Sequence, residues 1–542
     1  DYRPGDFRNR VELRSPQKDT FEVIEELFQS PDNKEEPMLV FYYNTRRCRQ
    51  TGVKLAEYRS KGKAKTRKRE IALAIKELVE KCDTTAELTD QIRCLNHGVA
   101  FYHARLQLKS KEIIENLFEK SLLDVIFTTP ALARGINMPA RTVVIPSPYK
   151  FSSSFGNIPI SRAEIEQICG RACRPPFQDK GFGIILTTNE SKFQEFEEKI
   201  SKPLEKMSSK FLQTLPRKGK TLNRYRLAVE IMKEVRMQKR LEAELSKLFD
   251  DYLFVQEIKD KKIVYKLLQE VTSTLITGKL ITKNIDGELI TPEIVDIVLD
   301  YGVDDLKKMI RLINLAKDIT EDKLELFSGQ IFGDILLALC KNYSSYRIGI
   351  IKEKYDPKRV KKCLIEETQT EPANIGNEHR LFTSLVLYSA GNSLGIIEEQ
   401  FGLASESIPY IARNVVSRDL ILLKALVENL CLGDRNKLNL CEYLEMWANI
   451  LNRGVPYQVL PFAQLIDRLG RKTALNILKE YGQAPAILKV LADETGIKRE
   501  FMKVTGISNT FSQRILDKRK ELIMNLQKKI KLWGTFSFSQ DS

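Results

Sequence analysis

The sequence predicts a multidomain protein in which an open α/β sheet is followed by three mainly helical blocks. In residues 1–200, apolar runs of strand length alternate with helical segments, which is the pattern of a parallel sheet covered by helices. From residue 201 the chain becomes helical and charged. A length of 542 residues with 42% hydrophobic residues is enough for several cores. We expect the domains to span residues 1–200, 201–303, 304–438 and 439–542.

The α/β block contains five apolar runs that are typical of buried strands. They cover residues 38–43, 99–102, 123–128, 142–145 and 183–187. The third run ends in Thr128-Thr129-Pro130 and opens into a short helix, a turn from which parallel sheets present ligand-binding loops. Seven Lys and Arg side chains lie between residues 59 and 69. We interpret this basic run as a solvated helix surface in preference to a nucleic-acid contact.

A β-hairpin is expected between the fourth and fifth strands, because two short runs flank the turn residues 152–157. Tyr149, Phe151 and Phe155 belong to this segment. They either stack on the last base pair of a duplex, at about 1 to 3 kcal/mol per base, or close a small core under the hairpin. The sequence favours neither alternative.

Residues 167–175 read Gln-Ile-Cys-Gly-Arg-Ala-Cys-Arg-Pro and place Arg171 and Arg174 one helical turn apart, beside Gln167. A guanidinium group is always charged, and its planar fork matches phosphate oxygens. In phosphoryl transfer it stabilises the charge of the transition state. Arginine pairs on helices are more often solvated, so the functional interpretation depends on the segments upstream.

Four segments occur in the order Leu-Val-Phe-x-x-x-x-Arg, Val-Ala-Phe-x-His-Ala-x-Leu, Thr-x-Ala-Leu-Ala-x-Gly-Ile-Asn-Met-Pro-Ala and Gln-x-x-Gly-Arg-Ala-x-Arg-Pro. They begin at residues 39, 99, 129 and 167. In this order and at this spacing they resemble helicase motifs IV, IVa, V and VI of the Ski-two-like superfamily-two helicases. Within that family the chain is most similar to the archaeal fork-repair branch.

The resemblance implies that residues 1–200 form a second RecA-like domain. It also implies that one wall of an ATP cleft is formed by Gln167, Arg171 and Arg174. Gly135 and Asn137 would couple this cleft to DNA held by Thr129, with glycine at a close approach of the backbone. Two positions depart from the family, because Cys173 and Arg105 stand where glycine is usual.

The family also needs a first RecA-like domain, whose Gly-x-x-x-x-Gly-Lys-Thr loop and Asp-Glu-x-His site hold phosphates and magnesium. Gly219-Lys220-Thr221 has Thr214 in place of the first glycine and lies in a basic linker, and Asp493-Glu494 is followed by Thr495. We therefore expect ATP and Mg²⁺ to be held mainly by a first domain in the same or another chain. The chain would be the C-terminal part of a longer helicase, or one subunit of a split one, and would not hydrolyse ATP alone.

The two middle blocks also follow the family's order. Residues 201–303 look like a winged helix, with wing strands at 279–281 and 287–292. The helical periodicity of 304–438 fits the ratchet domain, whose outline is clearest at 385–430, although the family's tryptophans are missing there. Arg413 and Arg418 lie five residues apart on this helix, and we expect one of them to reach single-stranded DNA.

The last block carries a second signal. Residues 465–474 resemble a helix-hairpin-helix, whose tight turn exposes backbone amides to a DNA phosphate. Arg468 replaces the first glycine, and Arg471 and Lys472 follow, so we expect all three to contact DNA. A fainter copy covers residues 504–509, and ten Lys or Arg stand against three acids between residues 498 and 531.

The composition agrees with an intracellular nucleic-acid enzyme. A formal charge of +15, from 87 Lys and Arg against 72 Asp and Glu, favours a polyanionic partner. The nine cysteines include no Cys-x-x-Cys, so we expect reduced thiols and no metal site. No apolar run is long enough to span a bilayer. We expect a cytoplasmic, nucleoid-associated protein, or a nuclear one if the source is eukaryotic.

Three functions remain in competition. The first is an ATP-dependent 3′ to 5′ DNA helicase that acts on forked or single-stranded DNA in repair and replication restart. The second is an RNA helicase of the same group, although the arch insertion and the β-sandwich typical of RNA-directed relatives are not visible. The third is a non-catalytic nucleic-acid-binding subunit.

Overall fold

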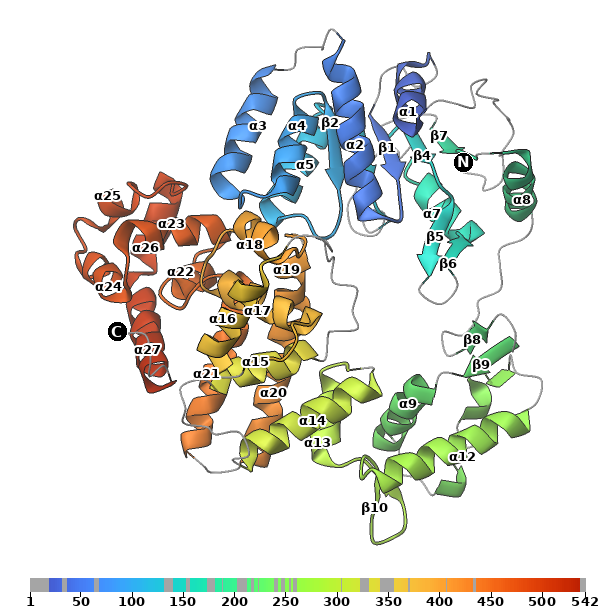
Figure 1. The fold of residues 1–542 in the computed structure, drawn as a ribbon, viewed down its shortest axis with the longest axis vertical. Coiled ribbons are helices and arrows are strands. Elements are labelled where there is room, and N and C mark those ends of the chain that lie inside the picture. The colour runs from blue at the N-terminus through green and yellow to red at the C-terminus, as the bar shows by residue number, and fades with distance from the viewer. Residues whose placement is uncertain are drawn as a thin grey trace.

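The chain, in a computed structural model, folds around two hydrophobic cores, one in the α/β block and one that runs through the helical blocks (Figure 1). The first core extends from Ile24 to Phe196, and the second from Leu227 to Leu526. The structure describes residues 19–31, 37–62, 68–130, 140–152, 156–172, 181–187, 189–201, 212–215, 219–222, 224–237, 242–244, 249–252, 255–256, 261–303, 305–321, 331–341, 355–368, 371–405, 407–431 and 435–536.

Five parallel strands form the sheet of the α/β block, in the order β2-β3-β1-β4-β7. Every residue of β1 to β4 is buried, as expected for apolar strands that have helices on both faces. All five predicted strands are confirmed, with ends that move by one or two residues. Their bounds are β1 Met38–Phe41, β2 Val99–Tyr102, β3 Val125–Thr128, β4 Thr142–Ile145 and β7 Phe182–Ile185.

Helices pack on this sheet through small residues and apolar faces. A Cβ atom on Gly52 would lie 3.3 Å from the Phe127 ring, so the glycine allows α2 to approach β3 closely. α7 packs against β4 and β7. The helices of this block are α1 Thr20–Gln29, α2 Thr45–Ser60, α3 Lys68–Lys81, α4 Ala86–Leu95, α5 Leu108–Glu119, α7 Arg162–Cys169 and α8 Glu190–Ser201.

The basic run at residues 59–69 is not uniformly solvated, so that prediction is wrong for its first member. Arg59 forms ion pairs with Glu25 at 2.7 Å and Asp124 at 2.9 Å, and it donates to the His97 carbonyl at 3.0 Å. The two acids lie 34 and 65 residues away in sequence, so a local charge count does not reveal them. Lys61 and Arg69 are exposed as predicted, and residues 63–67 lie outside the described ranges.

Two antiparallel hairpins lie in the next block, one before α9 and one between α12 and α13. β8 Leu212–Leu215 pairs with β9 Gly219–Leu222, so the Gly-Lys-Thr segment forms a strand and not the linker that was expected. β10 Thr282–Lys283 pairs with β11 Leu289–Ile290. The helices of this block are α9 Arg224–Met237, α12 Lys261–Thr277 and α13 Glu293–Asp300, with short 3₁₀ turns at Glu242–Glu244 and Phe249–Asp251.

The first of the two wing strands was predicted too early. Lys279 adopts a left-handed backbone, with φ of 55°, and the Leu280 amide donates to the Leu275 carbonyl at 2.9 Å. Residues 279–281 therefore close the end of α12, and β10 begins at Thr282. The second predicted strand contains β11.

The remaining chain is helical, as predicted. α20 packs against both α14 and α21, and α27 lies against α21, α22 and α24. The expected boundary at residue 438 falls within α21. The helices are α14 Leu306–Thr320, α15 Ile331–Lys341, α16 Pro357–Thr368, α17 Asn377–Ser389, α18 Leu394–Phe401, α19 Ser407–Ile411, α20 Ser417–Leu430, α21 Arg435–Arg453, α22 Leu460–Leu465, α23 Arg471–Tyr481, α24 Ala484–Ala492, α25 Ile497–Phe501, α26 Asn509–Asp517 and α27 Arg519–Phe536.

The helical blocks meet the α/β block at the ends of α3 and α5, which in Figure 1 lie just above α18, α22 and α23. α23 packs against α3. A Cβ atom on Gly395 of α18 would lie 2.5 Å from the Thr84 carbonyl oxygen, so the two backbones are in close contact. Within the ranges given above, no helix is both long enough and apolar enough to cross a bilayer.

Candidate nucleotide and nucleic-acid sites

The carboxyl edge of the parallel sheet holds the first candidate residue. β3 ends at Thr128, and the Tyr42 amide donates to the Thr128 carbonyl at 2.8 Å, which ties the ends of β1 and β3 together. Thr129 follows directly and is buried. Ligands of open α/β sheets bind outside this edge, so Thr129 lies where the sequence predicted a ligand-binding loop.

Helix α7 positions the glutamine and arginines of the second candidate group. The Ser161 side chain caps the helix, and the Ser161 amide donates to the Glu164 carboxylate at 2.9 Å. Lys150 donates to Glu164 at 2.7 Å, which ties the hairpin to the helix. Burial favours the neutral form of Glu164, but these hydrogen bonds outweigh it and lower the pKa of this carboxyl group. The start of α7 is therefore firmly fixed.

The end of α7 brings two distant segments together. Ala140 ends the motif that begins at Thr129, and it forms a parallel bridge with Ala172. Its amide lies 3.4 Å from the Arg171 carbonyl oxygen. Arg171 is 9% exposed, whereas Gln167 is exposed on α7. The other candidates of this group, Arg174, Gly135 and Asn137, lie outside the described residues.

The predicted hairpin is present. β5 Tyr149–Ser152 pairs with β6 Gly156–Pro159 in an antiparallel register. Tyr149 packs edge-on against Phe196 of α8, with 5.5 Å between ring centroids, and its hydroxyl donates to Glu195 at 3.1 Å. Burial and Glu195 raise the pKa of Tyr149. This contact corresponds to the small-core alternative for Tyr149, while the Phe151 side chain and Phe155 lie outside the described part.

Arg413 and Arg418, of which one was expected to reach single-stranded DNA, are both exposed. A π-helical turn, Ala412–Val416, separates α19 from α20, and the Ser417 amide bonds to the Ala412 carbonyl. Residues five apart lie nearly above one another in such a turn, so Arg413 and Arg418 share a face more closely than an α-helix would allow. π-Helical turns are frequent at functional sites, and the sequence pattern did not predict this one.

The predicted hairpin near residue 468 is a short turn between α22 and α23. Arg468 adopts a left-handed backbone with φ of 62°, the conformation that the replaced glycine would take, and its side chain is exposed. Gly470 precedes α23 as its N-cap. The structure therefore places a tight turn between two helices where the helix-hairpin-helix was expected.

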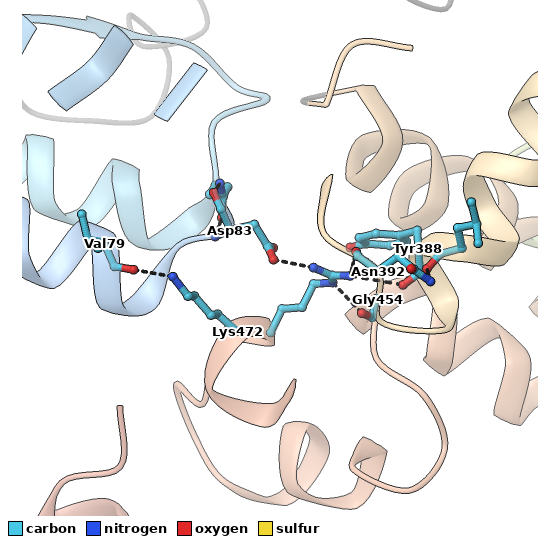
Figure 2. Close-up of polar contacts among 9 residues, drawn as sticks. Val79, Asp83, Tyr388, Asn392, Gly454 and Lys472 are labelled. Atoms are coloured by element: carbon cyan, nitrogen blue, oxygen red, sulfur yellow. Dashed lines mark hydrogen bonds and ion pairs between the residues drawn. The ribbon is translucent and has the colours of Figure 1, made fainter. Parts of the chain in front are cut away.

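Arg471 and Lys472, the next two candidates, contact the protein itself. Arg471 lies 2.6 Å from Asp83, and it also donates to the carbonyl oxygens of Gly454 at 2.5 Å and Asn392 at 2.8 Å (Figure 2). Lys472 donates to the Val79 carbonyl oxygen. Arg471 therefore joins α23 to the loop after α3 and to the segments at Asn392 and Gly454, and Lys472 joins it to α3.

The loop that carries Asp83 is braced from its own domain. Gln107 accepts from the Asp83 amide at 2.7 Å and donates to the Asp83 carbonyl at 2.9 Å. Thr85 caps α4 through a bond from the Leu88 amide. The carboxylate is thus presented to α23 by a rigid loop.

A turn between α25 and α26 lies at residues 504–509, where the fainter copy of the helix-hairpin-helix was expected. Gly506 has φ of 87°, and Ser508 caps α26 by accepting from the Phe511 amide. Asn476 of α23 donates to the Thr505 carbonyl at 2.8 Å, so α23 packs against the second turn.

A cavity of about 210 Å³ lies at the junction of the three parts. Its described lining includes Arg105 and Lys111 from the α/β block and Tyr410 and Arg413 from the ratchet helices. Sequence reasoning missed Arg105, Lys111 and Tyr410 as site residues. The available signal was the departure at Arg105, where the family usually has glycine.

No group of three or more His, Cys, Asp or Glu side chains that could hold a metal ion occurs in the described ranges. The arrangement supplies cationic and amide donors at the sheet edge and along α7. Such donors suit phosphate oxygens and do not suit a divalent metal.

Comparison with known proteins gives a consistent family of relatives. Residues 19–175 match the helicase conserved C-terminal domain. The chain is 38% identical over 116 residues to the ATP-dependent DNA helicase Hel308 of Methanocella arvoryzae and 32% identical over 189 residues to that of Pyrococcus horikoshii. It is 44% identical over 99 residues to the ATP-dependent DNA helicase MER3 homolog of Oryza sativa subsp. japonica.

These alignments cover limited parts of both partners. They include 21%, 35% and 18% of this chain, in the order given above. They span 15%, 26% and 8% of the length of the three relatives. The chain therefore corresponds to a minor part of each matched protein.

Proposed function

We propose that this chain, a relative of Hel308 within the Ski-two-like superfamily-two helicases, is part of an ATP-dependent DNA helicase. The relationship itself is confirmed by the helicase C-terminal domain match and by 32% to 38% identity to Hel308 proteins. The proposed enzyme moves 3′ to 5′ on forked or single-stranded DNA and serves repair and replication restart.

One structural observation carries the proposal. The bridge between Ala140 and Ala172 joins the end of the motif at 129–140 to the motif at 167–175. In the family, these two motifs couple the nucleotide to DNA. Ala140 lies two residues before β4 begins, so the two motifs meet beside the amino end of this strand. This contact supports the same coupling in this chain.

The chain would supply one half of the nucleotide site. Gln167, Arg171 and Arg174 would contact the phosphates of ATP, with the arginines stabilising charge as the γ-phosphate is transferred. Mg²⁺ and the loop that cradles the phosphates would come from a first RecA-like domain, in this chain's longer form or in another chain. The described residues fit the phosphates of ATP only in part, because the Gln167 side chain is exposed whereas the Arg171 side chain is largely buried. We therefore expect no ATP hydrolysis by residues 1–542 alone.

DNA would follow a path from the sheet edge to the helical blocks. Thr129, with Gly135 and Asn137, would hold it at the sheet. Arg413 and Arg418 would contact it along the ratchet helices, and Arg468 would contact it at the C-terminal turn. The contacts of Tyr149, Arg471 and Lys472 within the protein favour the remaining candidates, including Phe151 and Phe155, for direct DNA contact.

The test compares two activities in the complete enzyme that contains this chain. Arg174→Ala should abolish ATP hydrolysis and leave affinity for forked DNA unchanged, because a transition-state arginine is not needed to bind DNA. Near-normal turnover in this variant would refute the assignment. Affinities for forked DNA and single-stranded RNA, measured at one salt concentration, would separate the DNA helicase from an RNA helicase.

A further inference from the structure

The contact between Arg105 and Tyr410 lies at the junction cavity and joins the α/β block to the helical blocks. The Arg105 guanidinium lies over the Tyr410 ring, 5.4 Å from its centroid. Its Nη1 lies 3.4 Å from Ser407 Oγ, at the long limit of a hydrogen bond. Arg105 is therefore held against the ratchet helices by two weak interactions.

Tyr410 remains 44% exposed although Arg105 lies over its ring. It lies in α19, one residue before the helix gives way to the π-helical turn. Asn414 donates to the Tyr410 carbonyl at 3.1 Å within this turn. An exposed aromatic ring held by an irregular helical turn has a π-face that can accept a planar partner.

The surroundings of the ring are rich in positive charge. Lys111 and Arg413 line the same cavity, and burial together with Arg413 lowers the pKa of Lys111. Among the described residues of the lining, two are acidic, and both are engaged. Glu87 lies 3.0 Å from His103, and Asp83 is paired with Arg471. The cavity therefore has an excess of cations that suits a phosphate.

We infer that Arg105 is a displaceable plug on the Tyr410 ring, and that this ring is a binding site for one nucleotide of a single strand. A nucleobase takes the place of the guanidinium on the Tyr410 ring, and its phosphate lies toward Lys111 and Arg413. Pockets that enclose drug-sized ligands measure about 300 to 1,000 Å³. A cavity of about 210 Å³ is therefore suited to one base, with the strand continuing outside.

Replacement of the Arg105 guanidinium by a nucleobase is favourable because the two groups bind the Tyr410 ring with different strength. A cation over an exposed ring is held weakly, whereas stacking of a base on an aromatic side chain is stronger and does not depend on sequence. Arg105 is one of the two positions at which this chain departs from a glycine of the family. The plug is thus a feature of this chain, and it rests on the proposed function in one respect, namely that the chain binds single-stranded nucleic acid.

The experiment measures affinity of the complete chain for a fluorescent oligothymidylate and for an abasic strand of the same length, at fixed salt. Tyr410→Ala should weaken binding of the oligothymidylate roughly tenfold and leave binding of the abasic strand unchanged. Tyr410→Phe, which keeps the ring, should bind as the wild type does. Tyr301→Ala is the matched control, because Tyr301 is 39% exposed and lies outside the cavity lining.

Arg105→Ala gives the test of the plug. It should strengthen binding of the oligothymidylate severalfold, since no side chain has to leave the ring. A weaker complex would show that Arg105 contacts the strand directly and would overturn the plug.

The outcomes separate this inference from the proposed function. If the wild type binds both strands and Tyr410→Ala loses affinity equally for both, the stacking site is overturned and the proposed function survives. If the wild type binds neither strand, both fail. The melting temperature of each variant shows whether a loss of binding reflects loss of the fold.

Discussion

Arg471 Nη1 lies 2.6 Å from Asp83 Oδ1, and this ion pair joins residues 388 positions apart in sequence (Figure 2). Each side chain is 10% exposed. The Arg471 guanidinium also lies 4.7 Å from the centroid of the Tyr388 ring. A charge that is nearly buried is stable only when it is paired, and here one guanidinium satisfies a carboxylate, backbone carbonyls and an aromatic face. The pair therefore fixes α23 against the end of α3.

Arg471→Ala should destabilise the protein by about 3 to 5 kcal/mol, because it leaves the Asp83 carboxylate buried without its partner. Chemical denaturation measures this change. Lys503→Ala is the control, since the pair that Lys503 forms with Glu500 is exposed and worth at most about 1 kcal/mol. Equal costs in the two variants would mean that the Arg471 pair is not buried in solution.

Gly395→Ala should destabilise the same junction by about 1 to 3 kcal/mol, because the new methyl group would lie 2.5 Å from the Thr84 carbonyl and force the backbones apart. Gly534→Ala is the matched substitution, since nothing lies within 4 Å of its Cβ position in α27. That change should stabilise the protein by up to about 1 kcal/mol through lost freedom of the unfolded chain. Thermal melts of both variants measure these two changes in stability. A Gly395→Ala protein as stable as the wild type would contradict the close contact between Gly395 and Thr84.

The sheet could be predicted from sequence because buried parallel strands are continuous apolar runs with polar ends. Residues 99–102 and 142–145 were placed correctly for this reason. The resemblance implied that the motif at 129–140, which follows β3, couples to the cleft lined by the motif at 167–175, which begins at the end of α7. The bridge of Ala140 with Ala172 agrees with this expectation.

The contacts between blocks could not be predicted in this way. Arg471 was expected to face DNA because its local sequence resembles a helix-hairpin-helix, but Asp83 is brought to it by packing across the whole chain. The same holds for Arg105 and Tyr410, which come from different blocks. Local patterns reveal which residues are charged or aromatic, and tertiary packing decides what those residues face.

Asp419 should make stability depend on pH. Burial raises the pKa of this carboxyl group to about 6, although Lys308 lies 2.6 Å away and acts in the opposite direction. Because the folded pKa lies above the ordinary value, the stabilising contribution is complete below about pH 4 and is lost as the pH rises through about 6. The loss amounts to about 3 kcal/mol.

Asp419→Asn removes this titration. The free energy of unfolding, measured from pH 4 to pH 7, should fall less steeply in the variant than in the wild type. The difference between the two curves isolates Asp419 from other titrating groups. Parallel curves would contradict the raised pKa.

Arg468 allows charge and backbone effects to be separated at the C-terminal turn. If its exposed side chain contacts a DNA phosphate, both Arg468→Ala and Arg468→Gly should reduce the slope of log affinity against log salt by about 0.7 to 0.9. Stability should rise in Arg468→Gly and stay near that of the wild type in Arg468→Ala, because glycine relieves the left-handed backbone at φ of 62° and alanine does not. Salt titrations of DNA binding, together with thermal melts, measure the two effects. An unchanged slope in both variants would exclude a phosphate contact at Arg468. A lower slope together with higher stability in Arg468→Gly would show that the arginine contributes its charge to DNA binding and lowers the stability of the protein.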